Sequence, residues 1–246
     1  MAVDRVAVVT GGGRGIGAAV SRRLAADGFA VAVNYSRSGE NAERMVKEIE
    51  SAGGRALAVR ADIADAAQAT ALIEETSARL GTPTVLVNNA GVNHSGSARS
   101  QAPEEFDRVL AVNLSGAFYC THAALPGMYQ AKWGRVIFFG SPSGGRDLVP
   151  TMSAYAASKS GLVAMAKVMA KEAARHGVTV NTVVPGFVET DMVRSAGDLA
   201  LRNLKATWPG VPAEAVAATV SFLAGDDAAY VSGEEIGVWL GGPVSA

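Results

Sequence analysis

Tyr155 and Lys159 stand four residues apart, and these are the side chains whose types and spacing could do acid–base chemistry. On a helix, residues i and i+4 lie on the same face, so the phenol and the ammonium would project in one direction. A nearby positive charge favours the phenolate and lowers the pKa of a tyrosine from its ordinary value of about 10. Such a tyrosine can act as a general acid or base. The same two residues also fit an ordinary exposed helix without a catalytic role. Other segments of the chain are needed to distinguish these two interpretations.

Seven short apolar runs alternate with longer segments of helical periodicity. The runs are continuously apolar, which is typical of parallel strands that are buried on both faces of a sheet. They cover residues 5–10, 29–35, 55–62, 83–90, 134–141, 178–186 and 234–242. Helical segments lie at 15–27, 40–52, 65–80, 103–131 and 154–176. The alternation predicts a single α/β domain over residues 1–246, a Rossmann-type doubly wound sheet of about seven parallel strands with helices on both faces.

Composition excludes several classes of function. The 246 residues are 49% hydrophobic, enough for a core without disulfides, and Cys120 is the only cysteine. The net charge is −1 with no basic block, which argues against nucleic acid and anionic lipid as partners. No apolar stretch approaches the roughly 18 residues that span a bilayer, so we expect a cytoplasmic protein. The three histidines, His94, His122 and His176, lack the spacing of metal ligands, so no metal site is predicted.

The first predicted strand ends in a glycine-rich turn that opens a helix, "VVTGGGRGIGAAV". Gly11, Gly15 and Gly17 carry no Cβ that would block a pyrophosphate, and the helix N-terminal amides would point at its charge. Arg14 opposes the helix dipole at this position, so an anionic ligand explains it better than helix stability does. The turn therefore predicts a dinucleotide site.

The second strand ends "VNYSRS", without the acidic residue that grips the ribose 2′-hydroxyl of NAD. Ser36 and Arg37 could instead hold a 2′-phosphate, the arginine through charge-assisted hydrogen bonds. The alternative is that Arg14 and Arg37 are ordinary solvated residues. The pattern favours NADP(H) over NAD(H).

Taken together, these segments resemble the short-chain dehydrogenase/reductase family over essentially the whole chain, most of all its 3-oxoacyl-[acyl-carrier-protein] reductases. The matching motifs are "TGGGRGIG" (10–17), "NNAG" (88–91), Asn113 in "AVNLSGAF", Ser141 in "IFFGS", "YAASK" (155–159) and "PGFVET" (185–190). Their order and spacing together are far more specific than any one of them.

The resemblance implies roles for four catalytic residues. Tyr155 would protonate the substrate carbonyl oxygen as hydride arrives, and Lys159 would lower the Tyr155 pKa and bind the nicotinamide ribose. Ser141 would polarise the carbonyl. Asn113 would hold a water that links Lys159 to solvent.

The resemblance also implies a cofactor site drawn from several strand ends. Its residues are Gly11, Arg14, Gly15, Ile16, Gly17, Asn34, Tyr35, Ser36, Arg37, Asp62, Ile63, Asn89, Ala90, Gly91, Tyr155, Lys159, Pro185, Gly186, Val188 and Thr190. Asp62 matches the adenine-contacting acid of the family, whereas a role as helix cap fits Asp65 better. Asn89 could equally tie strand ends together, and Pro185-Gly186 could be a plain turn.

Several departures from the family pattern concern the substrate. The chain from Ser141 to Tyr155 is one residue longer than usual, which leaves Ser143 as a minor alternative for the serine role. The longer loop is expected to place Arg146 and Leu148 at the border of the substrate site. His94, after "NNAG", could touch substrate, and Trp239 replaces the usual polar ending. Residues 187–210 resemble a helical lid, whose apolar side chains would be Met192, Leu199 and Leu204.

The predicted function is NADPH-dependent reduction of a ketone, first of all a 3-oxoacyl thioester of acyl carrier protein or CoA. A polyketide-type, steroid or sugar ketoreductase is the alternative within enzymes, and a non-catalytic NADP-binding sensor is the alternative from another class. An acidic carrier protein could dock on four cations, Lys132, Arg135, Lys171 and Arg175. An ordinary role as solvated residues at helix ends explains these four equally well. Segments 103–131 and 154–176 are predicted to form the contacts of a homotetramer.

Overall fold

Seven strands form one parallel sheet in the order β3-β2-β1-β4-β5-β6-β7 in the computed structural model, as predicted. The structure describes residues 5–194, 201–202, 205–206 and 208–241, apart from the side chain of Met192. The strands are β1 (Val6–Val9), β2 (Ala30–Tyr35), β3 (Ala56–Arg60), β4 (Val85–Asn88), β5 (Gly134–Phe139), β6 (Val178–Pro185) and β7 (Glu235–Val238). The chain moves outward from β1 in one direction and then from β4 in the other. The pair β1–β4 is therefore the switch point at which such sheets bind nucleotides.

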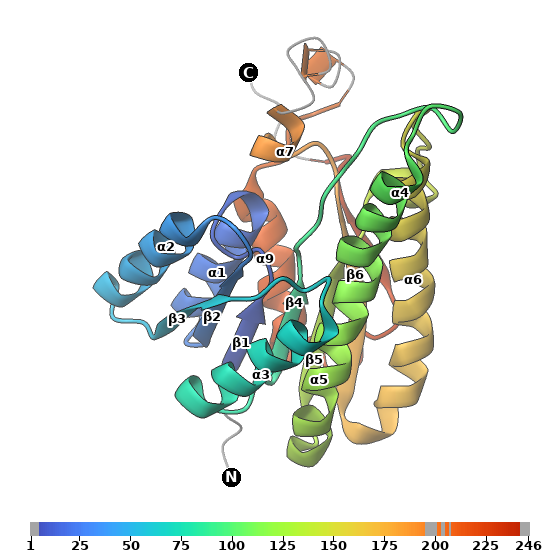
Figure 1. Cartoon of the computed structure of the whole chain (residues 1–246). Coiled ribbons are helices and arrows are strands. Elements are labelled where there is room, and N and C mark those ends of the chain that lie inside the picture. The colour runs from blue at the N-terminus through green and yellow to red at the C-terminus, as the bar shows by residue number, and fades with distance from the viewer. Residues whose placement is uncertain (1–4, 195–200, 203–204, 207, 242–246) are drawn as a thin grey trace.

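Helices cover both faces of this sheet (Figure 1). On one face lie α1 (Gly15–Ala26), α2 (Gly39–Ser51) and α9 (Ala213–Ala224). On the other lie α3 (Ala66–Leu80), α5 (Gly116–Ala131) and α6 (Ser153–Ala173). The short helix α7 (Asp191–Arg194) follows β6.

Alternate residues of each strand serve two separate cores. Val9 packs with α1, α2 and α9, whereas Val8 packs with α3, α5 and α6. The same division separates Phe139 from Phe138 on β5. Because both faces are covered by helices, both sets of side chains are apolar, which explains the continuous apolar runs of the sequence.

The predicted single helix over 103–131 is wrong in one respect, because the structure divides it. Helix α4 (Pro103–Leu110) passes into a π-helical turn, η1 (Ala111–Ser115), before α5 begins. Within this turn the side chain of Asn113 bonds to the backbone of Val92, outside the helix. π-turns of this kind occur inside α-helices mostly at functional sites.

The strand ends that carry the sequence motifs meet at one edge of the sheet. The register aligns Val9 with Val87, Phe139 with Val183, and Pro185 with Val238. The residues that follow β1, β4, β5 and β6 therefore lie side by side at the carboxyl edge. The fold thus places the glycine turn, "NNAG", Ser141 and "PGFVET" in one region.

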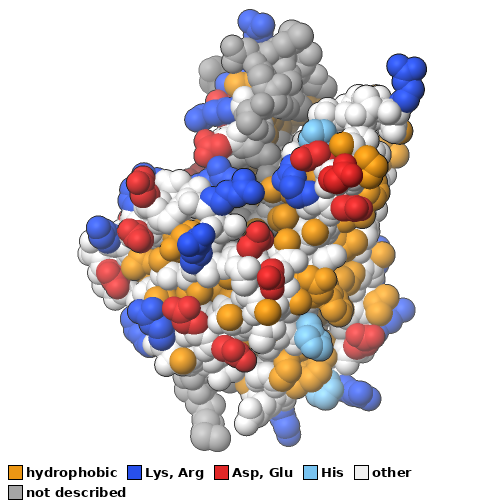
Figure 2. All heavy atoms as spheres, in the orientation of Figure 1, with side chains coloured by type: hydrophobic (Ala, Val, Ile, Leu, Met, Phe, Trp, Pro, Cys, Tyr) orange, Lys and Arg blue, Asp and Glu red, His pale blue; other side chains and the backbone are white. Residues whose placement is uncertain are grey.

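The outer surface carries charges of both signs, interspersed on the face seen in Figure 2, with apolar side chains gathered over α5. Within the described ranges, the helices are too short or too polar to cross a lipid bilayer.

Candidate active site

The glycine-rich turn between β1 and α1 adopts a backbone that requires glycine. Gly11 and Gly15 have φ angles of 63° and 52°, in the left-handed region that side chains disfavour. A Cβ on Gly17 would overlap the carbonyl oxygen of Gly11. The turn is therefore closed tightly on itself, with Gly12 and Gly13 buried and Gly15 exposed.

Two polar side chains fasten this turn to the end of β4. The hydroxyl oxygen of Thr10 accepts the backbone N–H groups of Asn89 and Ala90, each at 3.0 Å. The Asn89 amide nitrogen donates to the carbonyl oxygens of Thr10 at 2.9 Å and Gly11 at 3.2 Å. The side chain of Asn89 thus ties strand ends together, the alternative that the sequence left open. Its backbone and that of Ala90 remain at the sheet edge beside the turn.

Asn34 is a brace of the same kind and points into the protein. Its side-chain oxygen accepts the Gly11 N–H at 3.3 Å, and its nitrogen donates to the carbonyls of Val59 and Ala61. With 2% of its surface exposed, Asn34 holds the glycine turn against the end of β3. Its effect on a cofactor would be exerted through Gly11.

The residues predicted to select the cofactor phosphate are exposed at the same edge. Ser36 and Arg37 follow β2 on the surface, beside the partly buried Tyr35. Arg14 is the N-terminal flanking residue of α1, whose first turn holds no acidic residue and whose cap makes no side-chain hydrogen bond among the described residues. The Arg14 guanidinium lies 3.8 Å from the Asp191 carboxylate on α7. This exposed pair joins the glycine turn to the segment after β6.

After β3, the two aspartates have the different roles that the sequence suggested. Asp65 caps α3 by accepting the N–H groups of Ala67 at 2.8 Å and Gln68 at 3.1 Å. These bonds hold the pKa of the Asp65 carboxyl below its usual value. Asp62 is exposed at the strand end, where its carboxylate accepts the Ala64 N–H. Ile63 is buried against α5, so its side chain packs in the core.

Ser141, Tyr155 and Lys159 come together at the ends of β5 and α6. Ser141 flanks a short 3₁₀ turn, η2 (Pro142–Gly144), and its hydroxyl is near enough to the Tyr155 hydroxyl to act on the Tyr155 pKa. Lys159 is 4% exposed, and its Nζ donates to the Phe139 carbonyl oxygen at 2.7 Å. The same Nζ lies 5.6 Å from the centre of the Tyr155 ring. Ser141 acts on the Tyr155 pKa, whereas the backbone N–H of Ser143 donates to the Ser141 hydroxyl oxygen, which favours Ser141 for the serine role.

The pKa of Tyr155 moves in the direction opposite to the predicted one. Burial around the Tyr155 hydroxyl raises the pKa of this residue above its usual value, and the interaction with Ser141 only partly opposes the increase. The residue as a whole is partly exposed. Burial also lowers the pKa of Lys159 to about 8. The ammonium faces a backbone carbonyl and the ring rather than the phenol oxygen, which explains why its charge does not dominate the Tyr155 pKa.

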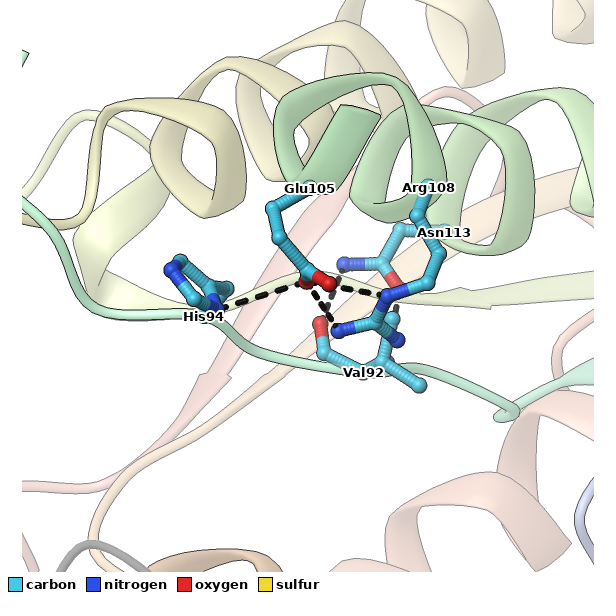
Figure 3. A network of polar contacts seen from close by, with 5 residues as sticks. All are labelled: Val92, His94, Glu105, Arg108 and Asn113. Atoms are coloured by element: carbon cyan, nitrogen blue, oxygen red, sulfur yellow. Dashed lines mark hydrogen bonds and ion pairs between the residues drawn. The ribbon is translucent and has the colours of Figure 1, made fainter. Parts of the chain in front are cut away.

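Asn113 uses its side chain to join the loop after β4, whose Val92 it contacts in Figure 3, to α6 through Ser158. Its Oδ1 accepts the Val92 N–H at 2.8 Å, and its Nδ2 donates to the Val92 carbonyl at 2.9 Å and the Ser158 hydroxyl at 3.1 Å. Gly91 packs here too, since a Cβ on it would lie 3.4 Å from Asn113 Oδ1 and 3.7 Å from Lys159 Nζ. Asn113 is therefore next to Lys159, as expected, but with its amide engaged by protein groups.

His94 belongs to a separate network on the same loop. Its Nδ1 lies 3.3 Å from Glu105 Oε2 on α4, and Arg108 bonds the same carboxylate at 2.7 Å (Figure 3). The pKa of the Glu105 carboxyl is below its usual value, mainly because of Arg108 and to a smaller extent because of His94. One imidazole nitrogen is thus directed to α4, and any contact of His94 with substrate would use the other.

The loop after Ser141 is fastened to the last strand. Arg146 Nε lies 3.0 Å from the Glu235 carboxylate, and its Nη2 donates to the Glu235 carbonyl at 3.1 Å. Trp239 packs its Cβ against Gly186 and its ring, at 5.5 Å between centres, against Trp208. Arg146 therefore has a protein partner already, whereas Leu148 is 68% exposed.

The "PGFVET" segment crosses from β6 to the glycine turn. The Gly186 N–H donates to the Val238 carbonyl at 3.0 Å, and Val188 is buried in the core beside α1 and α9. The Thr190 side chain reaches Gly15, where a Cβ would lie 3.2 Å from its methyl group. Thr190 thus stands over the glycine turn as expected. The side chain of Met192, and Leu199 and Leu204, lie outside the described residues.

Three residues of the site were missed by sequence reasoning. Thr10 carries a signal, because a hydroxyl directly before the glycines can accept amides from the neighbouring strand end. Ser158 could have been found from its position three residues after Tyr155, the distance at which a helical hydroxyl reaches a backbone carbonyl. Trp208 has no local signal, because its partner Trp239 is distant in sequence.

Comparison with known proteins supports the resemblance to the short-chain dehydrogenase/reductase family. Residues 5–199 match the family model for short chain dehydrogenases. The chain is 37% identical over 242 residues to a 3-oxoacyl-[acyl-carrier-protein] reductase of Staphylococcus aureus, covering 97% of this chain and 98% of that protein. It is 40% identical over 236 residues to the corresponding reductase of Synechocystis, covering 95% of each.

Among solved structures, a blue fluorescent protein from a metagenomic library, in complex with NADPH, superposes with a TM-score of 0.88. It is 38% identical, and the match covers 95% of this chain and 96% of that one. The match to the family model, the 37–40% identity over nearly the whole chain and the proximity of Ser141, Tyr155 and Lys159 all indicate the same family. The chain belongs to the short-chain dehydrogenase family of oxidoreductases.

Proposed function

We propose that this protein reduces a ketone to a secondary alcohol with NADPH, and that the ketone is a 3-oxoacyl thioester. The observation that carries the reaction is the contact of Ser141, Tyr155 and Lys159 at the sheet edge that also holds the glycine turn. The thioester is supported by the names of the Staphylococcus aureus and Synechocystis relatives.

The edge of the sheet suits NADP(H). Gly15 is exposed at the N-terminus of α1, whose first turn offers N–H groups and holds no acidic residue of its own, although Asp191 pairs with Arg14 there. Arg14, Ser36 and Arg37 are exposed there and could hold the extra phosphate. The metagenomic protein with the same fold binds NADPH, which supports this assignment.

The chain's own residues supply the proton and the electrostatic environment. When bound, NADPH would give a hydride to the carbonyl carbon. The Tyr155 hydroxyl donates its proton to the carbonyl oxygen, and Ser141, in contact with that hydroxyl, donates a second hydrogen bond to the same oxygen. We infer that the Lys159 ammonium, which lies 5.6 Å from the centre of the Tyr155 ring, turns from the Phe139 carbonyl toward the phenolate once that charge forms and then stabilises it.

The structure narrows what Asn113 can contribute to proton return. Its side-chain oxygen and nitrogen are both engaged by Val92 and Ser158. We infer that a water linking Lys159 to solvent is held by the backbone of the π-turn, and that the Asn113 amide fixes that backbone in place.

A ketoreductase acting on a bulkier ketone is the second candidate. The Trp208–Trp239 contact and the Arg146–Glu235 pair alter the region beyond Ser141, where a substrate's distal end would lie. A non-catalytic NADP-binding sensor is disfavoured, because such a protein has no need of the Ser141–Tyr155–Lys159 contact.

One predicted route for carrier-protein docking is wrong. Arg135 is 2% exposed and donates to backbone carbonyls, so it cannot meet a partner. Lys132, Lys171 and Arg175 are exposed but lie at or just after the ends of α5 and α6, before β5 and β6, at the edge opposite the catalytic residues of their own chain. An acyl carrier protein therefore enters our proposal only as a carrier of the thioester.

Self-association is the remaining part of the proposal. Phe118 on α5 is 43% exposed and Val168 on α6 is 57% exposed, in helices that pack on the same face of the sheet. Burying such residues against a second copy would be favourable. We propose a homotetramer that uses α5 and α6.

The proposed reaction is tested by following NADPH oxidation by absorbance with acetoacetyl-CoA, and with NADH in parallel. We expect turnover that depends on the thioester and is faster with NADPH. NADPH binding without turnover would contradict the thioester, and the assay would then be repeated with cyclic and aromatic ketones. Failure to bind NADPH at all would contradict the function as a whole.

The pH dependence of reduction follows from Lys159. Its pKa of about 8 means that the ammonium is present below that pH and is lost above it. Reduction needs that charge to stabilise the phenolate, so kcat/KM for the ketone should fall as pH rises through about 8. Measuring kcat/KM between pH 6 and pH 9 at saturating NADPH checks this. A profile that rises across this interval would contradict the role given to Lys159.

A further inference from the structure

Ser158 occupies a fully buried position between the two catalytic residues of α6. None of its surface is exposed. Its hydroxyl donates to the Tyr155 carbonyl oxygen at 2.7 Å and accepts the Asn113 Nδ2–H at 3.1 Å. In an α-helix that same carbonyl also accepts the N–H four residues later, which belongs to Lys159. The hydroxyl of Ser158 therefore bonds to the backbone turn that separates phenol from ammonium.

Asn113 extends this contact to the loop after β4. Through two bonds with the backbone of Val92, it grips the residue directly after Gly91. Gly91 in turn lies against Lys159, since a Cβ on it would be 3.7 Å from Lys159 Nζ. A continuous series of hydrogen bonds thus runs from the Val92 backbone through Asn113 and Ser158 to the Tyr155 backbone.

We propose that Ser158 is a positioning residue, which sets the place of the Tyr155–Lys159 turn relative to the Asn113 turn and the loop after β4. The expected effect on the reaction rate rests on the proposed function, whereas the structural link does not. Ser158 meets the reaction only through Asn113 and the backbone, and a displacement of about 1 Å in a reacting group can lower a rate by about 100-fold. Without the hydroxyl, the buried Asn113 N–H loses one acceptor and α6 loses its link to the loop.

The chain contains a matched control in Thr121. It is also fully buried on a helix, its hydroxyl donates to the Ala117 carbonyl at 2.7 Å, and it accepts the Asn88 Nδ2–H at 3.1 Å. Removing either hydroxyl therefore deletes the same two kinds of hydrogen bond in the same kind of surroundings. Thr121 lies on α5, and its helix carries none of the three catalytic side chains.

The kinetic test compares Ser158→Ala with Thr121→Ala. We expect Ser158→Ala to lower kcat about tenfold while the KM for the ketone changes less than about twofold, and Thr121→Ala to leave kcat within about twofold. Because Ser158 acts through Asn113, adding Ser158→Ala to Asn113→Ala should cause no further loss. Equal kcat values in the two single variants, or full additivity with Asn113→Ala, would overturn the proposal.

A second measurement does not depend on turnover. Hydrogen–deuterium exchange of residues 90–96 should be faster in Ser158→Ala than in the wild type and unchanged in Thr121→Ala. If the wild type shows no ketone reduction, the proposed function fails and exchange alone decides whether Ser158 holds this loop. Unchanged exchange at residues 90–96 in Ser158→Ala would refute the link from α6 to the loop.

Discussion

Tyr155→Phe should lower kcat for ketone reduction about 10²–10⁴-fold, the contribution typical of a positioned general acid. The variant removes only the hydroxyl that meets Ser141, and the ring remains to pack beside Lys159. Because no packing is lost, the free energy of unfolding and the dissociation constant for NADPH should stay close to the wild type. Steady-state kinetics, thermal unfolding and a fluorescence titration with NADPH measure these three quantities.

Tyr230→Phe is the matched control for this variant. Tyr230 is fully exposed, with a relative accessibility of 102%, and deletion of its hydroxyl should change neither rate nor binding. If Tyr155→Phe retained more than about a tenth of the wild-type kcat, another group would have to supply the proton. Loss of NADPH binding together with rate would instead show that the Tyr155 hydroxyl is needed to bind the cofactor.

Gly17→Ala should weaken NADPH binding about 10–100-fold, the range that corresponds to an overpacking cost of about 1–3 kcal/mol. The new methyl group would overlap the Gly11 carbonyl and lie 2.6 Å from Asn89 Nδ2. Relief requires the turn to open, which breaks its attachment to β4 and moves the N–H groups that face the pyrophosphate. The same NADPH titration measures the loss of affinity.

Gly210→Ala controls for the substitution itself. Among the described residues, no atom beyond the chain neighbours lies within 4 Å of a Cβ at Gly210, and its φ angle is not in the left-handed region. This variant should bind NADPH as the wild type does. Wild-type affinity in Gly17→Ala would show that the turn has room for a side chain, against the geometry described here.

The fold could be predicted from the sequence because its signals are local and repeated. Val8 and Val9 are adjacent and serve opposite cores, so the run around them is apolar without alternation, and only a strand covered on both faces explains this. The order of helices and strands then limits the topology to right-handed crossovers. The π-turn could not be predicted, because its Asn113 bonds to Val92, which lies 21 residues earlier in the chain and carries no local signal for this contact.

The sequence predicted which residues belong to the site, but it predicted less well which groups their side chains face. Asn34 and Asn113 each carry a donor and an acceptor, and the sequence does not tell whether these face a ligand or the protein. Both turn out to bond backbone groups more than 20 residues away. The pKa of Tyr155 was mispredicted for a related reason, because spacing places Lys159 on the same face but does not show that its Nζ turns to Phe139.

The packing of α1 against α9 has a consequence for the order in which the chain matures during synthesis. The braces of the glycine turn, Thr10, Asn34 and Asn89, all lie in the first 91 residues, together with the four strands that surround the turn. Because domains emerge from the ribosome N-terminus first, this N-terminal part can pair its strands early. The apolar face of α1, however, packs on residues 213–224. Until those residues are made, that face is open to chaperones, and a nascent chain halted before α9 would present it to them.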